Sequence, residues 1–555
     1  MSNNNDAAIT LLEKHFDIAF AAPDGVKKLR ELILSLAMQG KLVPQDPSDQ
    51  PASELLKEIE AEKKRLVKEG NIKQSKPLPE IKPEELPYDL PKSWEWLRLG
   101  ESVNFMTGKL DSNAAVENGI YPFFTCAKES LFIDHYAFDC EAVLLAGNNA
   151  AGKYSVKHYK GKFNAYQRTY VITVEFGQKK AIDYGYLKHL LENMLDDLQA
   201  KSLGTLTRFL TLGILKPIVI PLPPLAEQRR IVAKIDELMA RCDELERLRS
   251  DRDRKQITVH NSALNRLIIA KEQSDFNTAW QFITQHFSEL YSVKENVTEL
   301  RKAILQLAVM GKLVPQDPND QPASELLKEI EVEKERLIKE GKIKKIKPFP
   351  KITEEEKEFI LPTGWEWSRL QDVLDVRDGT HDSPQDAKGT ETYPLVTSKN
   401  FVNGKIDFSS ARQISANDHF EIVKRSKVDK LDILFSMIGG NIGNQVIVEE
   451  ERDFSIKNVA LFKYYNNQLT YPYFIKRYLE HLANGLQAKA AGGAQPFVSL
   501  GFLRNLVIAL PPTEEQRRIV AKITQLMALC DNLEKQIDNA NSKQTTLLNA
   551  VVTKV

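Results

Sequence analysis

The sequence predicts an α+β protein in which two globular α/β-type domains are joined by long antiparallel coiled-coil helices. Three observations support this prediction. Two blocks of sequence occur twice, a stretch of 86 residues contains no glycine or proline, and the segments between the repeated blocks differ from each other and are rich in β-forming residues. Repetition on this scale indicates that one structural unit is built twice. We therefore expect two equivalent halves related by a pseudo-two-fold axis.

The first repeated block is long and almost invariant. GKLVPQDPSDQPASELLKEIE, which begins at Gly40, returns at Gly311 with one difference in 21 positions. The offset of 271 residues still holds at the WEW triplets that begin at Trp94 and Trp365. The two halves are therefore internal copies of one sequence.

Two further matches show how the copies are connected. PPLAEQRRIVAKIDELMARCDELE from Pro223 matches PPTEEQRRIVAKITQLMALCDNLE from Pro511 at an offset of 288. SALNRLI from Ser262 resembles TLLNAVV from Thr546 at an offset of 284, and the offsets of 284 and 271 together equal the chain length of 555. The repeat is therefore circularly arranged, as in a cut ring, and we expect the two termini to lie close together.

The shared blocks predict helices. Apolar residues after Pro224 follow the 4-3-4-3 spacing of a coiled-coil seam, which predicts a helix from about residue 226 to 270 and a break near residues 274–277 before a second long helix. Apolar spacing from Val26 to Leu36 predicts an antiparallel partner helix that ends at Gly40, with a copy that ends at Gly311. Cys242 and Cys530 occupy matching seam positions, where we expect them to be core residues.

The divergent inserts predict globular domains. Short runs such as RTYVITV and NQVIVEE are separated by Gly, Asn and Asp turns, with some helix near residues 184–200 and 471–486. The chain is therefore divided into five segments: a helical region and linker at 1–97, a first globular domain at 98–222, a central helical region and linker at 223–368, a second globular domain at 369–510 and a C-terminal helix at 511–555.

Composition limits the classes of function. The 76 basic residues balance the 76 acidic residues, so the chain does not coat nucleic acid through bulk charge. The four cysteines, at 126, 140, 242 and 530, have no metal-type spacing and no disulfide framework, which favours a reducing compartment. No window approaches a membrane span. We expect a cytoplasmic protein with local sites for its partners.

One stretch resembles a phosphate-binding loop. LLAGNNAAGKYS, from Leu144, contains the glycines and the lysine of such a loop, but a tyrosine stands where Ser or Thr would bind Mg²⁺. The second insert has GGNIG from Gly439 at the corresponding place, with no lysine after it. We therefore expect a tight hairpin that serves the fold in both inserts, and an NTPase becomes the minor alternative.

The paired motifs together resemble the DNA specificity subunit of type I restriction-modification systems. They are the two WEW triplets, the two EQRRIVAKI blocks, the two GKLVPQDP blocks and the two unlike inserts, so the resemblance covers essentially the whole chain. It implies that the inserts are target recognition domains, each of which reads one half of a bipartite, asymmetric site in double-stranded DNA. It also implies that the helices set the half-site spacing.

The resemblance further implies partners and cofactors. Two methyltransferase subunits would dock on the helices, and restriction and translocase subunits would join through the complex to direct adenine methylation and restriction. No cofactor is expected in this chain, whereas S-adenosylmethionine, ATP and Mg²⁺ are expected on the partner subunits. The residues agree that no catalytic set is visible, because no adenine-methylation motif and no acidic cluster with nuclease spacing occur. We therefore predict a non-catalytic subunit with no metal of its own.

Basic and amide residues at turns of the first insert are candidates for DNA contact, because phosphate contacts set register and polar side chains at turns read base edges. No acid occurs from Ala142 to Val174, where lysines interleave with aromatic residues. The alternative is that two of the candidates, Asn148 and Asn149, merely tolerate a left-handed turn and that Arg168 is a solvated strand residue. The predicted contacts are Thr107, Lys109, Asn148, Asn149, Lys153, Gln167, Arg168 and Arg208.

The second insert has its own candidates. RDGTHDSP and TSKN resemble loops of some recognition domains in the family, and a basic cluster follows at residues 424–430. His381 beside Asp382 raises acid–base chemistry as an alternative, but a hydrogen bond within the loop is favoured because no nucleophile or metal set accompanies the pair. The predicted contacts are Arg377, Thr380, His381, Ser398, Lys399, Asn400 and Asn441.

The EQR triplets are candidates for partner binding. They either contact the methyltransferase or cap the first turn of their helix, where a carboxylate complements the helix dipole. The charged ASELLKEIE helices are either solvated faces or, because they are nearly identical, surfaces for a common partner bound twice. A coiled-coil adaptor that binds proteins without DNA specificity stays open as the alternative function. The candidate partner residues are Glu227, Gln228, Arg229, Glu515, Gln516 and Arg517.

Overall fold

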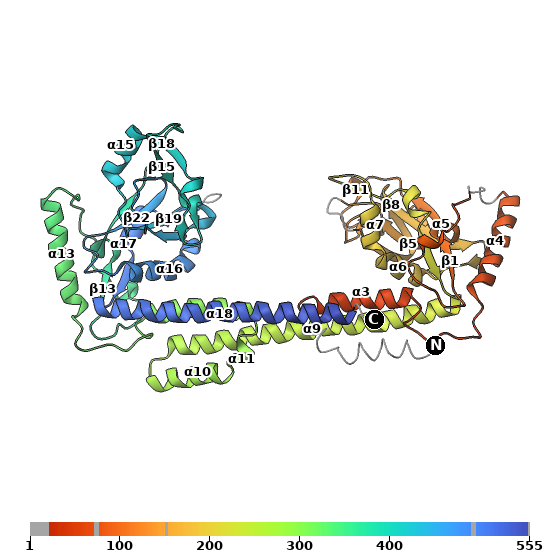
Figure 1. Cartoon of the computed structure of the whole chain (residues 1–555), viewed down its shortest axis with the longest axis horizontal. Coiled ribbons are helices and arrows are strands. Elements are labelled where there is room, and N and C mark those ends of the chain that lie inside the picture. Colours follow the sequence, from red (N-terminus) through yellow and green to blue (C-terminus); the bar gives the residue numbers. More distant parts are fainter. Residues whose placement is uncertain (1–21, 71–76, 150–153, 490–495, 553–555) are drawn as a thin grey trace. The chain divides into compact units, whose positions relative to one another are not determined.

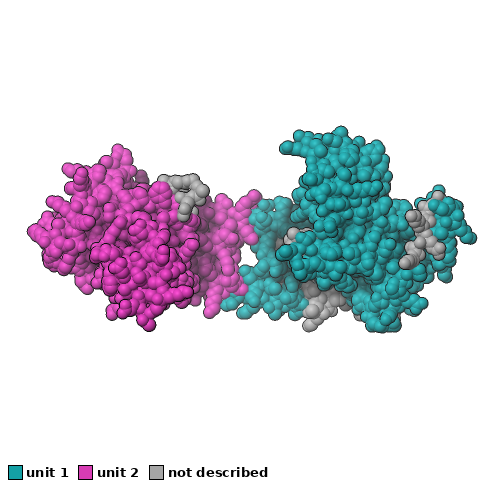
Figure 2. Space-filling view, turned by 90° about the horizontal axis from the view of Figure 1, so that it is seen from above, with its two compact units in different colours: residues 1–252, 539–555 teal, residues 253–538 magenta. Residues whose placement is uncertain are grey.

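The computed structural model describes residues 22–70, 77–149, 154–489 and 496–552. The chain divides into two compact units, residues 1–252 with 539–555 (unit 1) and residues 253–538 (unit 2), which Figure 2 shows in separate colours. The unit boundaries fall inside the two longest helices, α9 (Leu225–Ile269) and α18 (Thr513–Val552). The five-segment division of the sequence is not tested by these units and stays a prediction.

The C-terminal segment belongs to unit 1, as the circular repeat predicts. Leu548 packs on Ala22, and the Lys28 ammonium donates to the Asn549 side chain. Leu264, which precedes Leu548 by the offset of 284, is buried in the core of unit 2. The two equivalent leucines are therefore both buried, each within its own unit.

The helices of unit 1 form an antiparallel pair and a separate arm (Figure 1). Arg30 of α3 donates to Asp243 of α9 at 2.6 Å, while Arg249 of α9 donates to the Ala22 carbonyl, just before α3, at 2.7 Å. The two helices therefore run in opposite directions. The predicted helix at 226–270 and its partner are thereby confirmed within this unit. The helices that precede the globular region are α3 (Gly25–Met38), α4 (Ala52–Lys68) and the short η1 (Pro83–Glu85).

Unit 2 repeats this arrangement with one difference from the prediction. Arg301 donates to Asp531 of α18 at 2.6 Å, as Arg30 does to Asp243. The chain breaks after Ile269, earlier than expected, and the predicted second long helix is divided into three because hydrogen bonds are interrupted near His286 and again before Lys294. The helices are α10 (Gln273–Gln285), α11 (Phe287–Leu290), α12 (Lys294–Val309), α13 (Ala323–Lys339) and the short η3 (Glu354–Glu356).

Each globular region, here called a head, is closed by a two-stranded antiparallel ladder. In head 1, β1 (Glu95–Arg98) pairs with β12 (Val219–Leu222), and in head 2, β13 (Glu366–Arg369) pairs with β23 (Val507–Leu510). The chain therefore enters and leaves each head at one place. A helix begins shortly after each outgoing strand, just past the double proline.

Head 1 is built on a six-stranded sheet of order β2-β8-β5-β7-β3-β4, in which only β3 and β7 are parallel neighbours. Val143, Leu145 and Ile172 of its central strands are buried against α6. The elements between β1 and β12 are α5 (Leu99–Ser102), β2 (Asn104–Thr107), η2 (Ser112–Ala114), β3 (Tyr121–Phe124), β4 (Leu131–Ile133), β5 (Phe138–Ala146), β6 (Asn148–Asn149), β7 (Val156–Ala165), β8 (Thr169–Thr173), β9 (Glu175–Phe176), β10 (Lys179–Lys180), α6 (Tyr184–Asn193), α7 (Leu195–Lys201), β11 (Arg208–Phe209) and α8 (Leu212–Leu215).

In head 2 the main strands form two sheets instead of one, with the orders β14-β22-β19-β20 and β18-β15-β21. Phe435 and Phe462 of the first sheet are fully buried. The elements between β13 and β23 are α14 (Leu370–Val373), β14 (Leu374–Asp378), β15 (Thr392–Val396), η4 (Ser398–Asn400), β16 (Phe401–Val402), β17 (Lys405–Ile406), η5 (Phe408–Ser410), β18 (Arg412–Ser415), α15 (Ala416–Ser426), β19 (Ile433–Ser436), η6 (Gly439–Asn441), β20 (Gln445–Ile447), β21 (Ser455–Ile456), β22 (Val459–Tyr464), α16 (Pro472–Lys489) and α17 (Leu500–Asn505).

The predicted fold class is confirmed in each unit. Cys242 and Cys530 are each 1% exposed in the cores, as expected for seam residues. Gly40 and Gly311 both adopt φ +68° at the helix ends, a left-handed conformation that favours glycine. The segments that follow β5 and β19 both connect antiparallel strands, which agrees with hairpins rather than a phosphate loop, although residues 150–153 lie outside the described part of the chain.

Candidate nucleic-acid interface

Four turn segments of head 1 meet at one end of its sheet. Thr107, the last residue of β2, lies opposite Tyr170 of β8, and the turn before β8 carries Gln167 and Arg168. Together with Gly147 and Leu210 they line a cavity of about 300 Å³. Thr107, Gln167 and Arg168 are all exposed, so three of the predicted DNA contacts, from two distant parts of the sequence, share one polar hollow.

A small ladder involves three further candidates, Asn148, Asn149 and Arg208. β6 pairs with β11 so that Asn149 lies opposite Arg208 and Asn148 opposite Phe209. The Arg208 guanidinium is half-buried and donates to the Gln199 carbonyl at 3.0 Å, which fixes its position. Asn148 and Asn149 are therefore short-strand residues rather than the left-handed turn of the alternative interpretation. Only the backbone of Asn149 is described, and Lys153 lies outside the described residues.

Lys109 stands on the exposed loop that follows Thr107. The preceding Gly108 lies so close to the Ala165 carbonyl that a Cβ atom would clash with it. This close approach holds the loop against the turn that carries Gln167, whose amide donates to Asp111 at 3.2 Å. The loop and the turn therefore form one surface.

The basic and aromatic stretch along β7 is only partly a surface. Tyr154 is 6% exposed and belongs to the core, while the half-buried Tyr159 packs on Phe124 and Phe163, so both rings take part in packing within the head. Lys157 donates to the Ala127 carbonyl at 2.9 Å, and burial lowers its pKa. The aromatic interleaving in the sequence therefore reflects the sheet core.

Head 2 places an equivalent turn beside an equivalent loop. Gly379 lies against the Ile456 carbonyl as Gly108 does against that of Ala165. The loop continues into Thr380, whose backbone N–H donates to the same Ile456 carbonyl at 2.9 Å. Asn458 therefore stands where head 1 has Gln167.

His381 is held in its loop by two hydrogen bonds. Its ring nitrogens lie 3.0 Å from Asp378 Oδ2 and 3.2 Å from Asn458 Oδ1. Asp378 also pairs with Arg425, which belongs to the predicted basic cluster, and Arg377 pairs with Asp375 at 2.6 Å. The loop hydrogen bond that the sequence favours is confirmed, and this network fixes the polar loop of head 2.

The TSKN segment needs one correction. Asn400 is 5% exposed, its Oδ1 accepts from the Thr397 backbone N–H at 2.8 Å, and its amide donates to Ser410 at 3.2 Å. The prediction that Asn400 contacts DNA is therefore wrong, because its polar atoms already stabilise the turn. Ser398 is half-buried, whereas Lys399 and Asn441 are exposed, so these three stay predictions.

The sequence reasoning missed Asn458 and Lys457. Lys457 follows β21 and donates to Ser383, and Asn458 has φ +56° at the turn before β22. The signal was present, because Phe163 and Phe454 correspond in the two inserts, and four residues beyond them stand Gln167 and Asn458. Counting from a matched core residue would have found the pair.

The glutamates of the two EQR triplets are buried rather than available to a partner. Trp94 Nε1 donates to Glu227 Oε2 at 3.0 Å and Gln45 donates to Oε1 at 2.6 Å, while the indole of Trp365 donates to Glu515 at 3.0 Å. Burial raises the pKa of both glutamates. The prediction of partner binding is wrong for Glu227 and Glu515, because they stabilise the junction of helix and head.

The glutamines are equally internal. Gln228 and Gln516 are each 0% exposed, and their side chains accept from the backbone N–H groups of Asp183 and Tyr471. The prediction of partner binding is therefore wrong for Gln228 and Gln516. Capping of the first helical turn does not describe them either, because their hydrogen bonds join the helix to its head. Arg229 and Arg517 are exposed, and Arg517 lies over the Tyr471 ring at 4.9 Å.

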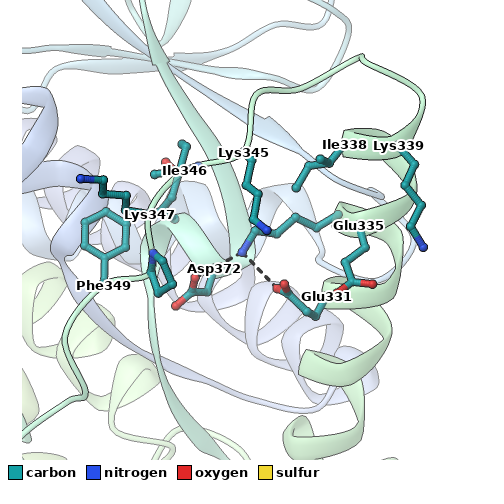
Figure 3. Close-up of a pocket in the computed structure, with 12 residues that line it drawn as sticks. Glu331, Glu335, Ile338, Lys339, Lys345, Ile346, Lys347, Phe349 and Asp372 are labelled. Atoms are coloured by element: carbon teal, nitrogen blue, oxygen red, sulfur yellow. Dashed lines mark hydrogen bonds and ion pairs between the residues drawn. The ribbon is translucent and has the colours of Figure 1, made fainter.

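A larger hollow lies in unit 2, where α13 meets α14 of head 2. Its volume is about 560 Å³, and it lies between α13 and the segment 345–349, as Figure 3 shows. Lys334 donates to Glu331 at 3.0 Å and to Asp372 at 3.4 Å across its floor. Gln371, its buried polar residue, is bonded to Tyr465 and to the Val376 N–H. These polar groups are already paired within the chain.

The comparisons with known proteins place the chain in a family. Residues 91–252 and 362–540 match the family described as type I restriction modification DNA specificity domain. The chain is 35% identical to the type I restriction enzyme EcoAI specificity subunit of Escherichia coli, over 95% of this chain and 93% of that protein. It is 32% identical to the EcoEI specificity subunit of Escherichia coli over the same shares. The chain therefore belongs to the family of type I restriction-modification DNA specificity proteins.

Solved structures show similarity over most of the chain. A chain from a study of complex assembly and conformational transition of the type I R-M system aligns with 84% of this chain and 98% of its own, with a TM-score of 0.48 and 19% identity. The HsdS subunit from Thermoanaerobacter tengcongensis aligns with 85% and 98%, with a TM-score of 0.38 and 19% identity. The family assignment rests on the sequence relationships. Within the described residues, no helix is long and apolar enough to span a membrane.

Proposed function

We propose that this chain is the sequence-specific DNA-recognition subunit of a type I complex, and that each head reads one half of a bipartite site. The observation that supports this most strongly is a duplicated set of helices and linkers that holds two unlike heads. These helices and linkers, residues 1–97, 223–368 and 511–555, are here called the frame. In each head, polar residues on a loop and a turn converge at one place, at Thr107 and Gln167 in head 1 and at Thr380 and Asn458 in head 2. Unlike polar sets at equivalent positions suit two different half-sites.

The complex would supply the chemistry. Two methyltransferase subunits would bind the frame, and S-adenosylmethionine, ATP and Mg²⁺ would act on the partner subunits. The chain itself would be non-catalytic. The charge balance of the chain also suits this division, because the partners would contribute much of the electrostatic attraction to DNA.

The test is a map of N6-methyladenine in DNA from a methylation-free host that carries the neighbouring methyltransferase gene, with and without this chain. We expect a bipartite motif that appears only when the chain is present. A chain with Gln167→Ala and Asn458→Ala tests the role of the heads and should weaken methylation of the same motif. If the two proteins copurify but no motif appears, DNA recognition is contradicted and the adaptor function gains support.

A further inference from the structure

The internal duplication allows the two copies of each surface to be compared within one chain. Residues 44–60 and 315–331, here called the repeated surface, form a loop and the first turns of α4 and α13. The copies differ only at Ser48 and Asn319, although most of their side chains are exposed. Exposed positions are not held constant by packing, so this identity requires another cause.

The neighbouring helices show that recent duplication is not a sufficient cause. α3 and the equivalent residues of α12 are identical at 7 of 14 positions, and most of these are core residues. The polar positions that face solvent have changed, and Lys28 and Glu31 are even replaced by Glu299 and Lys302. Two segments of the same age have therefore diverged to different extents, and the repeated surface has been retained.

Contacts inside the chain account for part of the identity. Gln45 donates to Glu227 at 2.6 Å, and Gln50 donates to Glu58 at 2.9 Å. The equivalent bonds occur in the second copy at 3.1 and 2.9 Å. These residues are constrained by the fold itself, so they cannot be used as evidence for a partner.

Three charged positions of the helix make no polar contact with the rest of the described chain. Among the described residues, Glu54, Lys57 and Glu60 form no hydrogen bond or ion pair outside their own helix, and the same is true of Glu325 and Lys328. Glu60 and its counterpart Glu331 have side chains that are 66% and 55% exposed. Their retention therefore points to a contact outside the chain.

The charge of the repeated surface identifies the class of partner. Its exposed charged residues are four acids and one lysine in each copy, namely Asp46, Glu54, Lys57, Glu58 and Glu60 in the first. An acidic surface repels DNA phosphates, so the heads and not this surface suit the DNA. A protein with basic side chains is the complementary partner.

We propose that the repeated surface is a docking site for the methyltransferase subunit, and that its two copies bind two copies of that subunit through basic residues. The proposal rests on the proposed function and adds the location of the interface. Two identical surfaces match one partner bound twice, whereas two unlike heads match two different half-sites. In unit 2 the hollow beside α13 adjoins this surface through Glu331 and offers room for a partner side chain.

The test reverses one charge in each copy. A chain with Glu60→Lys and Glu331→Lys is expected to bind the purified methyltransferase roughly tenfold more weakly. The control carries Glu31→Lys and Glu299→Lys, which are the same chemical change at an exposed and a half-buried position where the other copy already has lysine. The control should bind as the wild-type chain does. Binding is measured by calorimetry and by the mass of the complex.

Single variants distinguish the outcomes. Glu60→Lys alone should leave one strong site, so the complex should contain one methyltransferase at concentrations where the wild-type chain binds two. If wild type binds two copies and the double variant binds them equally well, the location of the interface is wrong while the proposed function stands. If wild type binds none, both are overturned. A change in DNA affinity alone, with methyltransferase binding unchanged, would assign the surface to DNA and also contradict the proposal.

Discussion

The two copies of the frame are closely similar to each other, whereas the two heads differ. The frame is repeated down to individual contacts: Trp94 and Trp365 donate to their buried glutamates at the same distance of 3.0 Å. Arg230 and Arg518 pair with their aspartates at 2.7 and 2.6 Å. The junction between helix and head therefore has the same contacts and nearly the same distances in both units.

The heads keep a common plan but differ in its execution. Head 1 has one six-stranded sheet, whereas head 2 has two smaller sheets and the additional helix α15. At the matched turn, Gln167 bonds Asp111 while Asn458 faces His381. A constant junction therefore leaves the loops free to change, since binding residues on loops are positioned by a rigid scaffold.

The largest effect is expected from replacing one head. If residues 98–222 are exchanged for residues 369–510, both ends of the frame will hold head 2, because the incoming and outgoing strands pair in the same register in both units. Methylation of the original motif should be lost, and a symmetric motif with the second half-site repeated should replace it. The adenine methylation map measures both.

The reverse exchange provides the control. Two copies of head 1 should give the other symmetric motif, with the same spacing if the frame alone sets it. A new motif that matches neither half-site would show that the heads influence each other, and the modular interpretation would then fail.

The second effect concerns the frame. Glu227→Ala leaves the Trp94 indole without its acceptor in the core and should lower the free energy of unfolding by about 2–3 kcal/mol. Glu515→Ala should have the same effect in unit 2. Urea unfolding followed by tryptophan fluorescence is the measurement. Glu227→Gln, which keeps one acceptor, is the control and should cost less; unequal effects of the two alanine variants would contradict the equivalence of the junctions.

The sequence predicted the frame more fully than the site. The helix expected from about 226 to 270 occupies Leu225–Ile269, because a long apolar seam without glycine or proline is a strong local signal. The roles of Glu227 and Gln228 depend on residues far away in the chain, such as Trp94 and Asp183, and no local pattern reveals such contacts. Thr107 and Gln167 were found from residue type, but their meeting at one hollow required the strand order.

The third effect tests whether equivalent turn residues act independently. Gln167→Ala and Asn458→Ala should each weaken binding of the cognate DNA by about 1–2 kcal/mol, since one polar contact to a base edge is lost. Gln167→Ala should relax selectivity in one half-site and Asn458→Ala in the other. Competition binding of the assembled complex with DNA substituted in one half-site distinguishes them. Ser409→Ala, in the η5 turn, should leave affinity unchanged, and equal loss at both half-sites would contradict separate reading.

The smallest effect is a pH dependence shared by the two junctions. Arg98 holds the pKa of Glu85 at about 2, below its usual 4.5, through side-chain hydrogen bonds, and Arg369 lowers the pKa of Glu356 in the same way. Because the folded-state pKa is depressed, the stabilisation is complete above about pH 4.5 and is lost as pH falls toward about 2. Glu85→Gln and Glu356→Gln should therefore lower the urea midpoint near neutral pH, and the difference from the wild-type chain should shrink as the solution is acidified. Since both arginines are almost completely buried, a junction whose variant showed no such pH dependence would not be using its ion pair, and the two halves of the frame would then differ in their chemistry despite their common geometry.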